Sequence, residues 1–304
     1  MPETIRVICG PTAAGKSAIA MWLAGRGPVT IISADSRQIY RGFDIGTAKP
    51  GGAEQARVPH RGIDVAAPGE RWSAAAWAAA AAGWIDEARA AGRLPLVVGG
   101  TGFYLRALFA PLFEEPALPA DRRRALEAVL ASLSLAELRR WCTAIDPERA
   151  HLGRAQLLRA LEVALLGGRR LSALHRTASR AARFSARYLV VDPGPALATR
   201  IAVRVGAMMD AGWEREVRRL ADTIPADAPA WNATGYRAIR ALTAGDMERT
   251  TAIEQVVIAT RQYAKRQRTW FRHQLAGADV THLNPDDPRR DELVARWWSG
   301  QGAT

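Results

Sequence analysis

The sequence predicts an α/β protein, in which a parallel sheet is flanked by helices and an all-helical domain is inserted. Four short apolar segments have the length and composition of buried strands, at residues 5–9, 29–32, 94–98 and 188–191. From residue 121 to about residue 183 the periodicity is helical, with no convincing strand. We therefore expect a core of residues 1–113 and 188–304, interrupted by a helical domain of residues 114–187.

A phosphate-binding loop follows the first apolar segment. Residues 10–17 fit the pattern Gly-x4-Gly-Lys-Ser, and a helix is predicted from residue 17 to residue 23. In such a loop the backbone N–H groups surround a phosphate at the helix N-terminus, Lys16 supplies a positive charge and Ser17 can bind Mg²⁺. The pattern predicts a P-loop NTPase-like core whose diphosphate-binding residues are Gly10, Pro11, Thr12, Ala13, Ala14, Gly15, Lys16 and Ser17.

The acidic residues at the predicted strand ends bear on the type of reaction. A nucleotide hydrolase or kinase needs an acid at the end of a second apolar strand to hold the magnesium shell. Segment 94–98 ends without an acid, whereas segment 188–191 ends in Asp192 before a proline, a common turn pattern. We interpret Asp192 as a turn residue, with a metal ligand as the alternative. Asp35 follows segment 29–32, at the sheet edge expected to carry the phosphate loop, where it can accept a proton.

Charge and cysteine usage narrow the class of protein. The 304 residues include 42 Lys plus Arg and 30 Asp plus Glu, a formal net charge of +12 that is typical of a nucleic-acid binder. The two cysteines, Cys9 and Cys142, suggest neither a disulfide framework nor a zinc site, which favours a reducing cytoplasm. We expect no signal peptide, because the first strand begins within five residues, and no membrane-spanning helix.

A stripe of positive charge is predicted on a helix from residue 247 to about residue 275. Its members are spaced four, three and four residues apart, so they share one helix face: Arg261, Lys265, Arg268 and Arg272. No acid lies on that face to pair with them, so we favour contact with an RNA phosphate backbone over a solvated surface.

Five motifs, in their order along the chain, resemble the tRNA dimethylallyltransferase family, also known as tRNA isopentenyltransferases. They are the phosphate loop, Asp-Ser-Arg-Gln-Ile-Tyr at 35–40, Asp-Ile-Gly-Thr-Ala-Lys-Pro at 44–50, Val-Gly-Gly-Thr-Gly-Phe-Tyr at 98–104 and Thr-Arg-Gln-Tyr-Ala-Lys-Arg-Gln at 260–267. The resemblance implies transfer of a dimethylallyl group from dimethylallyl diphosphate to N6 of the adenosine 3′ of the anticodon, tRNA position 37. The tRNAs would be those that read codons beginning with U, and the products would be diphosphate and N6-isopentenyladenosine.

The resemblance also implies roles for single residues. The phosphate loop would hold the diphosphate leaving group, with Mg²⁺ as cofactor at Ser17, and Arg204 matches a family arginine that reaches the same group. Asp35 matches the base that accepts a proton from the adenine amine, and Thr101 would hydrogen-bond nearby. The implied catalytic residues are Lys16, Asp35, Thr101 and Arg204, and the expected tRNA-binding residues are Asp35, Ser36, Arg37, Gln38, Thr101, Arg123, Gln156, Arg159, Arg261, Lys265, Arg268 and Arg272.

In the family the inserted domain grips the anticodon stem-loop. The segment Arg-Ala-Leu-Glu at residues 159–162 matches the family, whereas Ala155 and Gln156 stand where Gln-Arg is usual. A monomer is expected, because tRNA needs a large free surface.

Two other enzymatic hypotheses remain open. The same chemistry on free adenine nucleotide, as in adenylate isopentenyltransferases, would need neither the insertion nor the positive stripe. A small-molecule kinase or NTPase would use Asp192 as its metal acid, but the motif at 35–40 and the acid-free end of segment 94–98 count against it. A non-enzymatic RNA-binding module ranks last, because it leaves Lys16, Ser17 and Asp35 without a function.

Overall fold

The structure, a computed structural model, describes residues 2–110, 118–177, 182–275 and 278–300. It divides into two compact units, one of Met1–Phe109 with Arg183–Thr304 and one of Ala110–Ala182. The predicted boundary between residues 187 and 188 is wrong, because it falls inside strand β5, Phe184–Val191, which belongs to the sheet from its first residue. The other predicted boundary, between residues 113 and 114, lies outside the described residues.

A parallel sheet forms the centre of the first unit, as predicted. It has six strands in the order β3-β2-β4-β1-β5-β6. Its strands are β1 Glu3–Cys9, β2 Val29–Ser33, β3 His60–Arg61, β4 Leu94–Gly99, β5 and β6 Asp279–Leu283. In the register Cys9 lies beside Gly99 of β4 and Val190 of β5, so the carboxyl ends of the three central strands are level. The edge strands β3 and β6 were not predicted, because β3 has only two residues and β6 is mostly polar.

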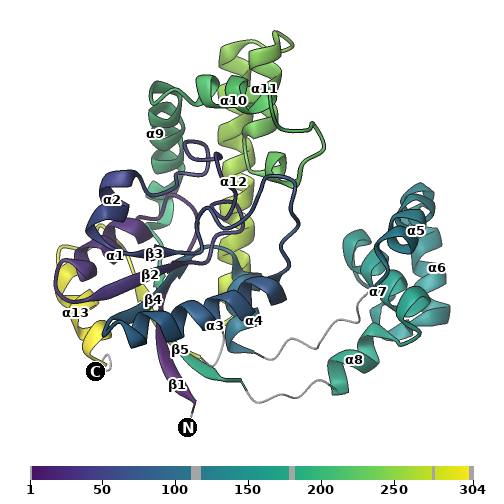
Figure 1. Cartoon of the computed structure of the whole chain (residues 1–304), viewed down its shortest axis with the longest axis horizontal. Helices are drawn as coiled ribbons and strands as arrows, with labels where there is room; N and C mark the ends of the chain where they lie inside the picture. Colours follow the sequence, from purple (N-terminus) through teal and green to yellow (C-terminus); the bar gives the residue numbers. More distant parts are fainter. Residues whose placement is uncertain (1, 111–117, 178–181, 276–277, 301–304) are drawn as a thin grey trace. The chain divides into compact units, whose positions relative to one another are not determined.

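Helices cover both faces of the sheet (Figure 1). On one face α1 Lys16–Ala24 and α13 Arg290–Ser299 pack their apolar residues, among them Leu23 and Trp297, against the strands. The other face carries the larger core, to which Trp77, Leu105 and Trp213 belong. The helices that contribute to this core are α3 Ala74–Ala90, α4 Gly102–Phe109, α9 Leu197–Asp210, α10 Trp213–Ala221, α11 Tyr236–Ala244 and α12 Arg249–Gln274. The short helix α2, Gly52–Arg57, follows β2.

Helix α3 shows how a segment very rich in alanine is fixed in place. The Ser73 hydroxyl accepts a hydrogen bond from the Ala76 N–H at 3.0 Å, which caps the helix N-terminus. Alanine has the highest helix propensity, and the larger residues Trp77 and Ile85 lie on the buried face with Ala81. The helix therefore forms from local propensity and is held to the sheet by these apolar contacts.

The second unit is helical in its described residues, and has a core of its own. Its elements are α5 Ala120–Ser132, α6 Leu135–Ile145, the 3-10 turn Pro147–Arg149, α7 Arg154–Gly167 and α8 Leu171–Thr177. Helix α6 begins with a capping box, in which the Glu137 carboxylate accepts the Ser134 N–H at 2.7 Å and the Ser134 hydroxyl accepts the Glu137 N–H. Leu130, Cys142 and Leu161 are fully buried between the helices.

Two expectations drawn from composition can be compared with the structure. Cys9 and Cys142 are both buried free thiols, in agreement with the expectation of no disulfide. Over the described ranges, every helix is either too short or too polar to cross a lipid bilayer.

Candidate functional site

The predicted phosphate loop joins β1 to α1 at the carboxyl edge of the sheet. Gly10 has a φ of 138°, and a Cβ atom there would lie 2.2 Å from the Val191 carbonyl oxygen, so only glycine fits between the two strands. The Lys16 ammonium group donates to the carbonyls of Gly10 at 3.0 Å and Pro11 at 2.7 Å. The strand, the loop and the helix therefore follow one another as the sequence indicated.

Gln267 of α12 braces this loop. Its Oε1 accepts a hydrogen bond from the Thr12 N–H, and its Nε2 donates to the Gly100 carbonyl, both at 2.8 Å. The side chain is 6% exposed, so both backbone groups depend on it rather than on water. Gln267 was not among the site residues predicted from the sequence. The signal was its place as the one polar residue on the buried face of α12 that also carries Ala264 and Phe271.

Two cavities meet beside the phosphate loop and share three lining residues, Thr12, Asp35 and Arg204. The first, here called the polar cavity, is also lined by Lys16 and Ser17. The second, here called the apolar cavity, has a wall built by Ile201, Val205, Met208, Trp213 and Val256. An anionic group and an apolar group can thus bind next to each other, with Asp35 and Arg204 at the junction.

The charges at the junction influence one another. The pKa of Lys16 is lowered to about 8, mainly by desolvation and also by the positive charge of Arg204, while the carboxylate of Asp35 opposes both effects. The pKa of Arg204 is also lowered by desolvation and raised by Asp35. Two cations that share one carboxylate leave an excess of positive charge, so a bound anion would be stabilised here.

Asp35 begins a turn immediately after β2. Its Oδ1 accepts the Arg37 N–H at 2.8 Å, which fixes the carboxylate where it lines both cavities. The Thr101 hydroxyl accepts the Ser36 N–H at 3.0 Å and is hydrogen-bonded to Tyr263. The turn is therefore tied to the glycine-rich segment that follows β4.

Tyr263 lies within the motif at residues 260–267 but was not predicted as a site residue. It lines the apolar cavity, whereas Thr101 lines neither cavity. The pKa of Tyr263 is raised to about 12, mainly by burial and also by the nearby Asp35, while the hydrogen bond with Thr101 opposes both effects. Its hydroxyl therefore stays protonated at neutral pH and can act as a hydrogen-bond donor.

Two predicted tRNA-binding residues near Asp35 have different environments. Arg37 lines the apolar cavity. Gln38 lines the polar cavity, but its amide nitrogen donates to the carbonyls of Thr47 at 3.2 Å and Ala48 at 3.0 Å. Its amide oxygen accepts the Ser33 hydroxyl at 3.0 Å. The Gln38 amide is thus used inside the protein.

The predicted positive stripe is divided in the structure. Arg261, Lys265 and Arg272 are exposed. The expectation that no acid pairs with the stripe is wrong for Arg268, whose Nε donates to Asp192 at 2.8 Å and whose Nη2 donates to Asp192 and to the Gly194 carbonyl. The acid comes from the end of β5, which packing brings beside α12, so it could not be seen on the helix itself.

In the second unit the predicted tRNA-binding residues contact other groups of the same unit. The buried carboxylate of Glu162 pairs with Arg159 at 2.9 Å and with Arg123 at 3.2 Å. The Gln156 side chain accepts the Gly153 N–H at 3.1 Å, which caps α7. A role of these residues in tRNA binding stays a prediction.

Ser17 is the one predicted metal ligand, and its surroundings suit a hard cation bound together with a phosphate. Among the residues that the structure describes, no cluster of three or more His, Cys, Asp or Glu side chains could hold a metal ion. Mg²⁺ commonly binds through one protein oxygen, water and phosphate oxygens. The Ser17 hydroxyl in the polar cavity, beside Lys16, fits that arrangement.

Comparison with known proteins finds relatives that match nearly the whole chain. The model of the IPP transferase family matches residues 38–274. The tRNA dimethylallyltransferase of Gloeobacter violaceus is 45% identical over 98% of this chain and its own full length, and that of Halorhodospira halophila is 43% identical over 92% of this chain and 94% of its own. The crystal structure of the tRNA isopentenylpyrophosphate transferase of Bacillus halodurans is 32% identical, has a TM-score of 0.70, and is covered over 97% of its length by 99% of this chain. A eukaryotic dimethylallyltransferase that acts on tRNA shares the fold, with a TM-score of 0.83 at 22% identity.

Proposed function

The chain belongs to the IPP transferase family, and we propose that it is a tRNA dimethylallyltransferase, which moves a dimethylallyl group from dimethylallyl diphosphate to tRNA. Relatives named for this activity match nearly the whole chain, which supports the proposal. The finer proposal is that the acceptor is N6 of adenosine 37, in tRNAs that read codons beginning with U. The products would be N6-isopentenyladenosine and diphosphate.

One observation carries the proposal: the polar cavity beside the phosphate loop and the apolar cavity meet at Asp35 and Arg204. A prenyl diphosphate has an anionic end and a five-carbon apolar end, and the bond that breaks lies between them. The diphosphate would occupy the polar cavity, and the apolar cavity would hold the prenyl end of the donor. The reacting carbon would then lie near Asp35.

The nucleophile requires a base at that position. The lone pair of an adenine amine is delocalised into the ring, so the amine attacks carbon only as its proton is removed. Asp35 is the carboxylate shared by both cavities, and its hydrogen bond to the Arg37 N–H holds it there. We assign it as the general base.

The leaving group requires positive charge. As the allylic C–O bond breaks, negative charge grows on the diphosphate, and the phosphate-loop N–H groups, Lys16 and Arg204 would stabilise it. When bound at Ser17, Mg²⁺ would neutralise further diphosphate charge. Because Lys16 and Arg204 repel each other, a bound diphosphate also removes an unfavourable interaction.

The kinase alternative loses support from the position of Asp192. Its carboxylate accepts two hydrogen bonds from Arg268 and one from the Gly194 N–H, so it is committed to closing the turn after β5. The alternative acceptor, free adenine nucleotide, is less compatible with the separate helical unit, which a small substrate would not need.

The test is a labelling assay. Purified protein is incubated with Mg²⁺, radiolabelled dimethylallyl diphosphate and either unmodified tRNA or AMP, with a parallel reaction in EDTA. We expect label in tRNA alone, on the adenosine beside the anticodon, and little label in EDTA. Label in AMP would assign the chain to adenylate prenylation. ATP turnover in a parallel reaction with added ATP, without label transfer, would favour a kinase or NTPase.

We also propose that the protein is a cytoplasmic monomer. The monomeric state follows from the proposed substrate, because tRNA needs a large free surface. Gel filtration with light scattering would test the monomeric state.

A further inference from the structure

An irregular segment of residues 44–49, here called the wall segment, contributes to both cavities. Gly46 and Thr47 line the apolar cavity, and Ala48 lines the polar cavity. A Cβ atom at Gly46 would lie 2.2 Å from the Trp213 ring, so the backbone rests directly on that indole. The shape of both cavities therefore depends on where this segment lies, although it is neither helix nor strand.

A buried carboxylate holds one end of the wall segment. Glu216 of α10 is 4% exposed, and its Oε2 accepts the N–H groups of Asp44 at 3.0 Å and Ile45 at 2.7 Å. Its Oε1 accepts the Tyr236 hydroxyl at 2.7 Å. A buried carboxylate is tolerated only when such charge-assisted hydrogen bonds satisfy it. Two of these three bonds end on the wall segment rather than on the helical framework.

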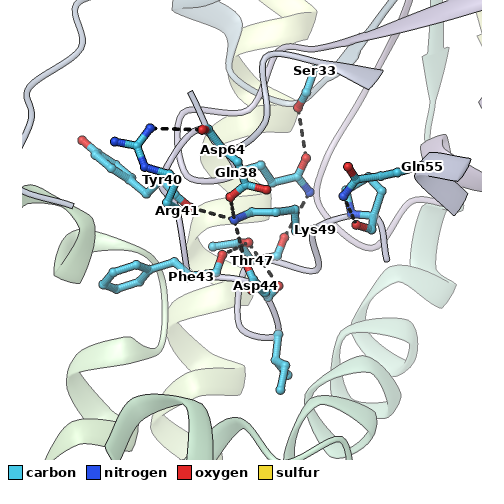
Figure 2. Close-up of polar contacts among 12 residues, drawn as sticks. Ser33, Gln38, Tyr40, Arg41, Phe43, Asp44, Thr47, Lys49, Gln55 and Asp64 are labelled. Atoms are coloured by element: carbon cyan, nitrogen blue, oxygen red, sulfur yellow. Dashed lines mark hydrogen bonds and ion pairs between the residues drawn. The ribbon is translucent and has the colours of Figure 1, made fainter. Parts of the chain in front are cut away.

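A buried lysine holds the other end. The Lys49 side chain is 2% exposed, and its Nζ donates to the Tyr40 carbonyl at 2.7 Å, to Asp44 at 2.5 Å and to Asp64 at 2.6 Å (Figure 2). An ammonium group has three N–H donors, and three acceptors surround this one. Lys49 thus ties the wall segment to two neighbouring loops.

The wall segment is linked to the turn that carries Asp35. Gln38, three residues after Asp35, donates its amide hydrogens to the carbonyls of Thr47 and Ala48. Gln38 and Thr47 are labelled in Figure 2. Ala48 adopts a φ of 47°, a left-handed conformation that costs a non-glycine residue about 1 kcal/mol or more and that the surroundings must hold. A shift of the wall segment would therefore move both the cavity wall and the base.

We propose that Glu216 and Lys49 are positioning residues: they hold the wall segment so that the apolar cavity and the Asp35 turn keep the geometry that transfer requires. Neither residue would touch the reacting atoms. This inference rests on the proposed function and names residues that act behind that site. Because small displacements of reacting groups can lower a rate by about 10²-fold, their loss should lower kcat more than substrate affinity.

Steady-state kinetics on paired variants separates positioning from general stability. Glu216→Ala removes the hydrogen bonds to Asp44 and Ile45 of the wall segment together with the bond to Tyr236. Tyr236→Phe removes only the bond between Tyr236 and Glu216. We expect Glu216→Ala to lower kcat by about 10-fold to 100-fold, with tRNA and dimethylallyl diphosphate affinities within about 3-fold. Tyr236→Phe should lower Tm but keep the kcat of the wild type.

Three further variants complete the design. Glu216→Gln, whose amide oxygen can still accept both N–H groups, should recover most of the kcat lost in Glu216→Ala. Lys49→Met should repeat the kcat loss from the other end of the segment, which keeps the test decisive if Glu216→Ala does not fold. Glu214→Gln is the matched control, because Glu214 lies on the same helix and its carboxylate pairs with Arg218 and Arg249.

The outcomes separate this inference from the function on which it rests. Wild-type kcat in folded Glu216→Ala and Lys49→Met would overturn it while leaving the enzyme assignment intact. An equal loss of kcat in Tyr236→Phe would also overturn it, because stability alone would then explain the effect. A wild-type protein that labels no tRNA would overturn the proposed function, and this inference with it.

Discussion

At the scale of single residues, the site depends on a carboxylate held between two cations. Asp35 raises the pKa of both Lys16 and Arg204, whereas desolvation lowers both. The carboxylate therefore has two functions in the proposed reaction: it balances charge before the diphosphate arrives, and it can accept the amine proton once the diphosphate has taken over that balance.

The first prediction is that Asp35→Asn lowers kcat by about 10²-fold to 10⁴-fold, because an amide cannot act as the base. The amide oxygen can still accept the Arg37 N–H, so the turn and tRNA affinity should change little. Single-turnover labelling of tRNA and filter binding measure the two effects. Asp86→Asn, which alters an exposed ion pair with Arg183, is the control. Wild-type turnover in Asp35→Asn would exclude the assignment.

At the scale of elements, α12 uses two faces for two purposes. The buried face carries Ala264, Gln267 and Phe271, and through Gln267 it fixes both the phosphate loop and the turn after β4. The exposed face carries Arg261, Lys265 and Arg272. One helix thus connects the site proposed for diphosphate with the surface proposed for RNA.

The second prediction concerns the buried face. Gln267→Ala leaves the Thr12 N–H and the Gly100 carbonyl without their partner, so the free energy of unfolding should fall by about 1–3 kcal/mol. The KM for dimethylallyl diphosphate should rise, because the phosphate loop loses its brace. Urea unfolding and steady-state kinetics measure these changes. Gln262→Ala, at an exposed position of the same helix, should change neither.

The third prediction concerns the positive stripe. Arg272→Ala should weaken tRNA binding and reduce the slope of log affinity against log salt by about one unit, as expected for one lost phosphate contact. Arg268→Ala should leave that slope unchanged and lower Tm instead, because Arg268 is bonded to Asp192 and Gly194. Binding titrations at several salt concentrations and thermal melts distinguish the two. A reduced slope in Arg268→Ala would mean that the ion pair opens to bind RNA.

At the scale of the whole molecule, the two units have separate cores. Each core contains one cysteine, Cys9 in the sheet of the first unit and Cys142 in the helical second unit. Burial raises the pKa of both thiols, so the reactive thiolate is suppressed in the folded state at neutral pH. Each thiol can therefore report the opening of its own unit.

The fourth prediction is that neither thiol reacts with a disulfide reagent at pH 7.5 in the native protein, whereas both react after unfolding. Labelling in increasing urea, followed by peptide mass mapping, gives the midpoint for each unit. Different midpoints would show independent unfolding, and coincident ones a cooperative transition. Rapid labelling of Cys9 without denaturant would contradict the buried position of β1.

The parts of the site that a short stretch of sequence can specify were predictable. The phosphate loop is such a part, since strand, glycines, Lys16 and Ser17 must follow one another for the backbone to surround a phosphate. Asp35 was predictable for a related reason, because it follows an apolar strand and parallel strands end at one edge. The fold class followed from the same strands, although the short edge strands β3 and β6 gave too weak a pattern.

By itself, then, the sequence determined the parallel sheet, the helical insertion, the phosphate loop and the acid beside it. Only the tertiary structure decided the partners of the side chains. Gln267 contacts Thr12 at a separation of 255 residues, Glu216 contacts Ile45 at 171, and Arg268 contacts Asp192 at 76. Local periodicity shows which face of an element is buried, but not which distant backbone group or carboxylate packing brings against it. For that reason the residues proposed to bind the diphosphate were visible in the sequence, whereas Gln267 and Glu216, which hold the neighbouring backbone in place, were not.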